Sequence, residues 1–180
     1  MSNINKDYLE REKDTHDMWA LEEDYRLFNP SSFENGLSLP ECKWLFDSID
    51  FKNKKVLDIG CGLGESSIFF AKKGAKVSAI DISEGVISKA KTKADEENVE
   101  IKFYVTNGES LDLFENDYFD YIYAANLLHH LEIGEIIDEV RLKLSKGGSF
   151  LSWDPIAYNP IINIYRKMAM GVRTIDEHPL

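Results

Sequence analysis

The sequence predicts an α/β fold in which a mostly parallel sheet carries helices on both faces. Short apolar runs alternate with segments of helical spacing from about residue 55 to residue 153. The first of these runs is apolar nearly throughout, which suits a strand buried on both faces of a parallel sheet. A glycine-rich loop joins that run to the first helical segment. Strands alternating with helices form βαβ units with right-handed crossovers, so we expect a doubly wound sheet.

Five strands and three helices make up this predicted core. The strands are Lys55–Ile59, Lys76–Asp81, Val99–Val105, Phe119–Ala124 and Ser149–Trp153. The helices are Glu65–Lys73, a segment from Ser83 to about Asn98, and Ile133–Ser145, which Lys146-Gly147-Gly148 closes. Gly74 is a plausible C-terminal cap of the first helix, and the Ser83 side chain can cap the second.

Two helical segments are expected ahead of the core, at residues 5–28 and 39–49, separated by a loop around Pro30–Gly36. Residues 1–50 are therefore predicted to form a helical cap, and residues 51–155 the α/β core. Residues 156–180 are predicted to be a C-terminal helical segment of the same single domain.

Composition and charge favour a globular protein and argue against a membrane-spanning, secreted or nucleic-acid-binding one. The chain has 180 residues, 43% of them apolar and 29% charged, as in an ordinary globular domain. Its net charge of -11 argues against a duplex nucleic acid as partner, since such proteins normally carry a basic stripe. No apolar stretch is long enough to span a membrane, and the polar N-terminus does not resemble a secretory signal. Two cysteines without metal-ligand spacing favour the cytoplasm and no metal site.

The loop Asp58-Ile59-Gly60-Cys61-Gly62-Leu63-Gly64 is the strongest functional signal. Small residues between a buried strand and a helix let the backbone approach a ligand, and free N–H groups at the helix start face it. In an open α/β sheet the ligand crevice lies at the carboxyl ends of the strands. The loop therefore predicts a small-molecule or cofactor site there.

The spacing of the glycines separates two cofactor classes. A dinucleotide fingerprint has the form G-x-G-x-x-G and would place its third glycine at position 65, where this chain has glutamate. An acid at the helix start would also repel a phosphate. Asp81, which ends the second strand 21 residues after Gly60, can accept both ribose hydroxyls of either cofactor. An NAD-dependent oxidoreductase therefore remains the less favoured alternative.

The run VLDIGCGLGESSIFFAKKGAKVSAIDIS resembles motif I and the following acidic strand of class I S-adenosylmethionine-dependent methyltransferases, especially the small-molecule type often called type 11. The similarity continues through FDYIYAANLLHHL and LKLSKGGSFLSWDP and covers roughly residues 50–155. It implies a Rossmann-like sheet of strand order 3-2-1-4-5 and S-adenosylmethionine as cofactor. It also implies methyl transfer to a small-molecule acceptor by in-line displacement.

The resemblance assigns the cofactor-binding residues. Asp58 and the glycine loop would surround the methionine part, Asp81 would bind the ribose hydroxyls, and Ile82 would pack on the adenine. Asn107 would replace the acid that commonly bonds the adenine amino group, and the side chain or backbone of Asn126 would contact the cofactor. The full set of predicted cofactor-binding residues is Asp58, Gly60, Cys61, Gly62, Gly64, Asp81, Ile82, Asn107, Gly108, Glu109 and Asn126.

Catalytic candidates follow the fourth strand. His129 or His130 could serve as a general base, because an unperturbed imidazole titrates near neutral pH; the alternative is that one packs and the other bonds the adjacent loop. Asp154 at the end of the fifth strand could touch the acceptor. Aromatic residues of the N-terminal segment, Trp19 and Tyr25, pack in the core or form a lid over the cofactor, as relatives often have.

The family fold has seven strands, and the residues from position 155 to position 180 are too few for a helix and two more strands. We therefore expect the last two family strands to be missing and the fifth strand to have an open edge. The chain would then be a fragment, or a second copy or a partner chain would cover that edge. A non-catalytic cofactor-binding subunit that needs a partner chain is the alternative function.

Overall fold

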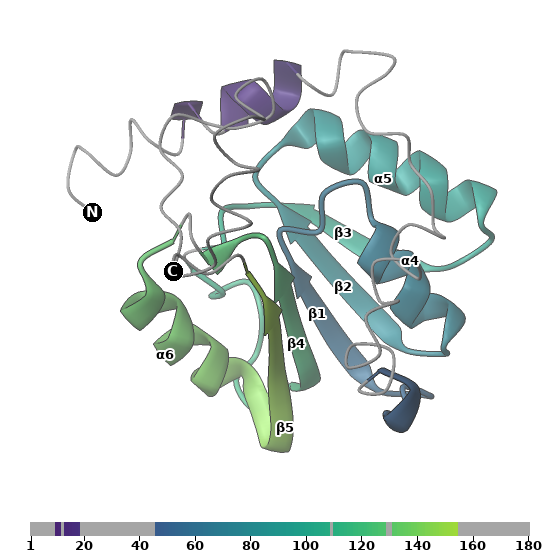
Figure 1. Cartoon of the computed structure of the whole chain (residues 1–180), viewed down its shortest axis with the longest axis vertical. Helices are drawn as coiled ribbons and strands as arrows, with labels where there is room; N and C mark the ends of the chain where they lie inside the picture. The colour runs from purple at the N-terminus through teal and green to yellow at the C-terminus, as the bar shows by residue number, and fades with distance from the viewer. Residues whose placement is uncertain (1–9, 12, 19–45, 109, 129–130, 155–180) are drawn as a thin grey trace, which may run out of the picture.

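The computed structural model describes residues 10–11, 13–18, 46–108, 110–128 and 131–154. Their central feature is a five-stranded sheet of order β3-β2-β1-β4-β5, in which every pairing is parallel (Figure 1). The strands are β1 (Lys55–Ile59), β2 (Lys76–Asp81), β3 (Ile101–Val105), β4 (Phe119–Ala125) and β5 (Leu144–Trp153). The predicted fold class and strand order are confirmed.

Helices cover both faces of the sheet. They are α4 (Glu65–Lys72), α5 (Glu84–Glu96) and α6 (Ile133–Lys143). Figure 1 shows α4 and α5 on one side of the sheet and α6 on the other. Ser83 caps α5 as predicted, because its side chain accepts a hydrogen bond of 3.0 Å from the backbone N–H of Val86. The switch of sides between α5 and α6 makes the sheet doubly wound and leaves the ends of β1 and β4 beside each other.

The predicted boundary between α6 and β5 is wrong. The pattern of the sequence predicts a helix up to Ser145 and a strand from Ser149, but the helix ends at Lys143 and the strand begins at Leu144. Leu144 pairs with Phe119, and Ser149 then pairs with Tyr121, so the strand contains a register shift. The glycines that looked like the end of a helix lie inside this irregular strand.

Backbone geometry explains why glycines occupy that position. Gly147 has a φ of 84°, a left-handed conformation that side chains disfavour. A β-carbon on Gly148 would lie 3.0 Å from the carbonyl oxygens of Phe119 and Asp120. The start of β5 therefore approaches β4 more closely than a residue with a side chain would allow.

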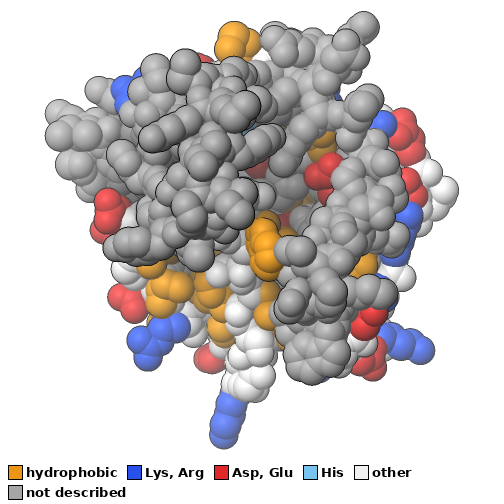
Figure 2. Space-filling model, viewed as in Figure 1, with side chains coloured by type: hydrophobic (Ala, Val, Ile, Leu, Met, Phe, Trp, Pro, Cys, Tyr) orange, Lys and Arg blue, Asp and Glu red, His pale blue; other side chains and the backbone are white. Residues whose placement is uncertain are grey.

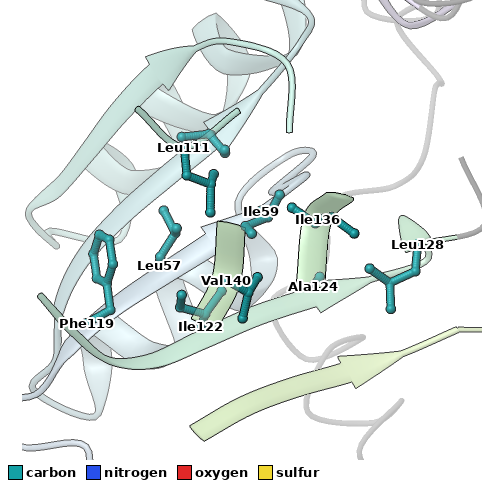
Figure 3. Packing of buried hydrophobic residues seen from close by; sticks show 10 residues of the cluster. Leu57, Ile59, Leu111, Phe119, Ile122, Ala124, Leu128, Ile136 and Val140 are labelled. Carbon is teal, nitrogen blue, oxygen red and sulfur yellow. The ribbon is translucent and has the colours of Figure 1, made fainter. Parts of the chain in front are cut away.

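Two apolar clusters lie on opposite faces of the sheet. Leu57 and Ile59 of β1 face the first cluster, which packs under α6, whereas Val56 faces the second. This alternation is the period of a strand. The buried members of the first cluster are Ile80 and the nine residues labelled in Figure 3, Leu57, Ile59, Leu111, Phe119, Ile122, Ala124, Leu128, Ile136 and Val140. The second is largely aromatic and contains Phe46, Phe51, Phe69, Phe70 and Tyr123.

The N-terminal predictions are covered only in part. Residues 10–11 and 13–18 are helical, as are residues 46–48, while the rest of the two expected helices lies outside the described residues. The C-terminal segment 156–180 also lies outside them, so the predicted domain boundaries and the missing strands stay predictions. In the part of the chain that the structure describes, no helix has the length and apolarity to cross a membrane. Among the described residues visible in Figure 2, basic and acidic side chains are interspersed.

Candidate active site

The glycine loop follows β1 and leads directly into α4. All three glycines have positive φ angles, 68° at Gly60, 53° at Gly62 and 85° at Gly64, so the loop adopts a path that other residues disfavour. The N–H of Cys61 donates to the carbonyl of Ile80 at 2.9 Å, and the N–H of Gly64 donates to the carbonyl of Cys61 at 2.9 Å. These bonds fold the loop back against the end of β2.

Each glycine has a different neighbourhood. A β-carbon on Gly60 would lie 3.0 Å from a methyl carbon of Leu127, and one on Gly64 would lie 3.3 Å from the β-carbon of Ala90. Among the described residues, none lies within 4 Å of a β-carbon placed on Gly62. Gly60 and Gly64 are thus required for packing, whereas no described residue blocks the approach of a ligand to the backbone of Gly62.

Asp81 ends β2 and lies against the loop. It is 7% exposed, and its Oδ2 accepts a hydrogen bond of 3.0 Å from the N–H of Gly62. Its Oδ1 accepts one of 3.0 Å from the N–H of Ser83. A carboxylate has about four acceptor positions, so each oxygen keeps one for a ligand hydroxyl. Ile82 follows at once and is half-buried.

Asp58 is buried beneath the start of α4. It is 1% exposed, and its Oδ2 accepts hydrogen bonds from the hydroxyls of Ser66 at 2.6 Å and Ser67 at 2.5 Å. Burial raises the pKa of Asp58 from 3.8 to about 6; the two serine hydroxyls oppose this rise, and the charge of Asp81 adds to it. The carboxylate therefore ties the first turn of α4 to β1 and changes charge slightly below neutral pH.

Cys61 contributes to the shape of the loop through its side chain. The thiol is buried in a small cluster with Ala79 and Ile87, under the loop. Burial, together with the charges of Asp81 and Asp58, raises the pKa of the Cys61 thiol well above its usual value. The thiol therefore stays protonated and is not a nucleophile at neutral pH.

The segment after β3 returns to the same end of the sheet. The N–H of Thr106 donates to the carbonyl of Asp81 at 2.9 Å, which places Asn107 and Gly108 next to the end of β2. A β-carbon on Gly108 would lie 3.0 Å from Ile59. The structure thus brings together the predicted residues Asp58, Gly60, Cys61, Gly62, Gly64, Asp81, Ile82, Asn107 and Gly108, while Glu109 lies outside the described residues.

The segment after β4 forms the other border of the site. Asn126 is exposed and has a φ of 52°, and its N–H donates to the carbonyl of Trp153 at 2.8 Å. Leu127 then covers Gly60. Asp154 follows β5 and is half-buried. The candidates His129 and His130, like Trp19 and Tyr25, lie outside the described residues.

Comparison with known proteins identifies the family. Residues 56–148, just over half of the chain, match the family model described as a methyltransferase domain. The chain belongs to this family. It is a class I S-adenosylmethionine-dependent methyltransferase, the class that the motif I resemblance predicts and that the order of the strands confirms.

Relatives of this methyltransferase agree with that class. A ubiquinone biosynthesis O-methyltransferase from Stutzerimonas stutzeri is 29% identical over 161 residues, which are 89% of this chain and 67% of the relative. A solved structure from Pyrococcus horikoshii is 27% identical with a TM-score of 0.66, over 84% of this chain and 70% of that one. An S-adenosylmethionine-dependent methyltransferase structure from Mesorhizobium loti is 25% identical with a TM-score of 0.57, over 64% of this chain and 54% of that one. The chain thus spans about two thirds of the length of the relative from Stutzerimonas stutzeri. None of these relatives supports the alternative of an NAD-dependent oxidoreductase.

Four polar residues that hold the carboxylates of the candidate site, or the turn beside it, are not among the residues predicted from the sequence. Ser66 and Ser67 bind Asp58, and the run Glu65-Ser66-Ser67 at the predicted helix start was the available signal. Ser83 was predicted only as a cap, but its N–H also orients Asp81. Asp17 accepts a hydrogen bond from the Ser83 hydroxyl, a contact between residues 66 positions apart that no local pattern indicates.

Proposed function

We propose that this methyltransferase binds S-adenosylmethionine at the glycine loop and transfers its methyl group to a hydroxyl oxygen of a small molecule. The observation that carries the cofactor assignment is the pairing of Asp81 with Gly62. Each Asp81 oxygen is held by one backbone N–H and keeps one free acceptor position, beside a glycine that no described residue blocks from a ligand. Two adjacent acceptors of this kind match the two hydroxyls of a ribose.

The neighbouring residues complete the proposed cofactor site. Ile82 would pack against the adenine, and Asn107, Gly108 and Glu109 would border its edge. Asp58, Gly60, Cys61 and Gly64 would shape the methionine end, with Asn126 on the β4 side. The turn after β3 supports this division, because Thr106 bonds directly to the backbone of Asp81.

S-adenosylmethionine supplies an electrophilic methyl group on a sulfonium. In the transfer, a bond forms between the acceptor oxygen and the methyl carbon while the carbon–sulfur bond breaks, and its electron pair stays on sulfur. The protein mainly has to hold the acceptor oxygen about 3–3.5 Å from the methyl carbon, in line with the breaking bond. The hydroxyl proton has to leave, and His129 or His130 would accept it as general base.

Two observations support an oxygen acceptor and this place for the base. The relative from Stutzerimonas stutzeri is named as an O-methyltransferase, and it aligns with 89% of this chain. The two histidines directly follow Leu128 in the segment whose Leu127 covers the glycine loop. We further propose that the protein works in the cytoplasm. We also propose that a second chain, either another copy or a partner, covers β5, which is an edge strand of the described sheet.

Transfer of a labelled methyl group tests this function. The protein is incubated with methyl-labelled S-adenosylmethionine and matched sets of phenols, alcohols, amines and thiols. Label in hydroxyl compounds alone supports the proposal, and label only in amines or thiols contradicts the oxygen assignment. A chain that binds the cofactor but labels no acceptor is the non-catalytic subunit instead. His129→Ala and His130→Ala, measured separately, should leave cofactor affinity unchanged, and the variant that removes the base should lower turnover by about 10²-fold or more.

A further inference from the structure

The carboxylate of Asp17, in the N-terminal helical segment, contacts the turn that follows Asp81. Oδ1 of Asp17 accepts a hydrogen bond of 2.5 Å from the hydroxyl of Ser83 and one of 3.0 Å from the N–H of Gly85. Figure 1 shows this segment, drawn in purple, above the start of α5. Two strong acceptor contacts thus join residue 17 to the turn between β2 and α5.

The turn that Asp17 holds is the same turn that holds Asp81. Ser83 donates its backbone N–H to Oδ1 of Asp81 at 3.0 Å and its hydroxyl to Asp17. The same hydroxyl accepts the N–H of Val86 at 3.0 Å. The N–H and the hydroxyl of Ser83 are therefore both hydrogen-bonded. The position of Ser83 depends on the carboxylates of Asp81 and Asp17.

The charge of Asp17 suits its place at a helix start. Burial opposes ionisation, but the hydrogen bonds from Ser83 and Gly85 and the charge of Lys13 outweigh it, so the pKa of Asp17 lies below its usual value. The Asp17 carboxylate is therefore ionised at neutral pH. A negative charge at the N-terminus of α5 also interacts favourably with the helix dipole.

We propose that Asp17 is a positioning residue that fastens the N-terminal helix to the turn carrying Asp81 and Ile82. Docking of the helix and binding of the adenosine half of the cofactor are thereby coupled. The identity of that ligand rests on the proposed function, whereas docking of the helix does not. Because coupling between two binding events is reciprocal, the ligand tightens the docking as much as the docking tightens the ligand.

Three single variants test the coupling in the full chain. Asp17→Ala removes both hydrogen bonds, whereas Asp17→Asn keeps an amide oxygen that can accept both. Glu10→Ala is the matched control, because Glu10 lies in the same segment, is exposed, and is not next to the bond after Lys13. We measure the affinity for S-adenosylhomocysteine by calorimetry, and the rate of tryptic cleavage after Lys13 with and without that ligand.

Asp17→Ala should bind S-adenosylhomocysteine about five- to tenfold more weakly, as expected for lost charge-assisted hydrogen bonds. Cleavage after Lys13 should be faster, and the ligand should protect that bond less than in the unchanged protein. Asp17→Asn should restore part of the affinity, because its amide oxygen accepts the same hydrogen bonds without the charge. Glu10→Ala should match the unchanged protein in both measurements. A residue with a merely structural role would not alter the protection by the ligand.

Two results would overturn the inference. One is an Asp17→Ala protein with unchanged affinity and unchanged cleavage. The other is faster cleavage with unchanged affinity, because docking would then be independent of the ligand. If the unchanged protein does not bind S-adenosylhomocysteine, the proposed function fails, and the cleavage rates without ligand still decide whether Asp17 docks the helix.

Discussion

The two halves of the sheet differ in how deeply the residues at their carboxyl ends are buried. At the ends of β1 and β2, Asp58 and Asp81 are buried, the glycine loop bonds to Ile80 and Asp81, and the Asp58 carboxylate ties down the first turn of α4. At the ends of β4 and β5, the N–H of Asn126 bonds to the carbonyl of Trp153, but both side chains are exposed. The β1–β2 half is therefore already arranged to bind one ligand, whereas the β4–β5 half has exposed side chains next to that ligand site.

This difference indicates that the two halves bind different ligands. A cofactor is the same in every turnover, so residues that bind it can be fixed by packing and internal hydrogen bonds. An acceptor differs among members of one family, and variation is tolerated best where side chains and backbone are exposed. We therefore propose that the cofactor lies in the β1–β2 half, with Asn126 at its border, and the acceptor in the β4–β5 half. The following predictions concern the stability of the two halves and the binding of the cofactor.

The largest effect is expected in the β4–β5 half, on folding. In Gly148→Ala the new β-carbon would lie 3.0 Å from the carbonyl oxygens of Phe119, Asp120 and Ser145, none of which can move without shifting backbone. The free energy of unfolding should fall by about 3 kcal/mol. Chemical denaturation measures it. An unchanged midpoint would mean that the two strands are not in such close contact.

The next effect is on ligand binding in the β1–β2 half. Asp81→Ala removes the acceptors that we assign to the ribose, so cofactor affinity should weaken by about 1–3 kcal/mol while the fold persists. Calorimetry with S-adenosylhomocysteine measures the affinity, and circular dichroism checks the fold. Unchanged affinity would remove Asp81 from the site.

The pKa of Asp58 predicts opposite trends for stability and binding. Because the pKa of Asp58 is raised to about 6 in the folded protein, its contribution to stability falls as the pH rises from about 4 through 6. The ionised carboxylate favours the cationic methionine end of the cofactor, so affinity should rise over the same range. We expect binding about tenfold weaker at pH 5 than at pH 8.

Calorimetry with S-adenosylmethionine at several pH values between 5 and 8 measures the affinity of the protein for the cofactor. Asp58→Asn is the control. The variant should show a flatter pH dependence of affinity, because its side chain does not titrate. An equally steep dependence in Asp58→Asn would assign the titration to another group and leave Asp58 a structural role alone.

The smallest effect is a gain in stability. No residue in the described part of the chain lies within 4 Å of a β-carbon placed on Gly134, in the first turn of α6, and Gly134 is not among the glycines with positive φ. Gly134→Ala should stabilise the protein by about 0.5 kcal/mol, because alanine loses less backbone entropy on folding. Thermal unfolding measures this change, and a lower melting temperature would show that the helix start is more crowded than its geometry indicates.

The same two halves differ in how well the sequence predicted them. The bounds of β1 and β2 were predicted correctly, because each is a short apolar run whose end is marked, by the glycine loop after Ile59 and by the final Asp81 with its helix cap Ser83. The start of β5 was not, because Lys146-Gly147-Gly148 has the composition of a helix end and only the pairing of Leu144 with Phe119 makes it strand. Contacts between distant residues, such as Asp17 with Ser83, leave no periodic signal in the chain.

The central claim is that the glycine loop and Asp81 form a site for S-adenosylmethionine, and calorimetry with three ligands tests it most directly. S-adenosylmethionine, S-adenosylhomocysteine and NAD are titrated separately into the unchanged protein. We expect one molecule of either adenosyl compound to bind per chain, with no heat from NAD. Binding of NAD without binding of either adenosyl compound would contradict the claim.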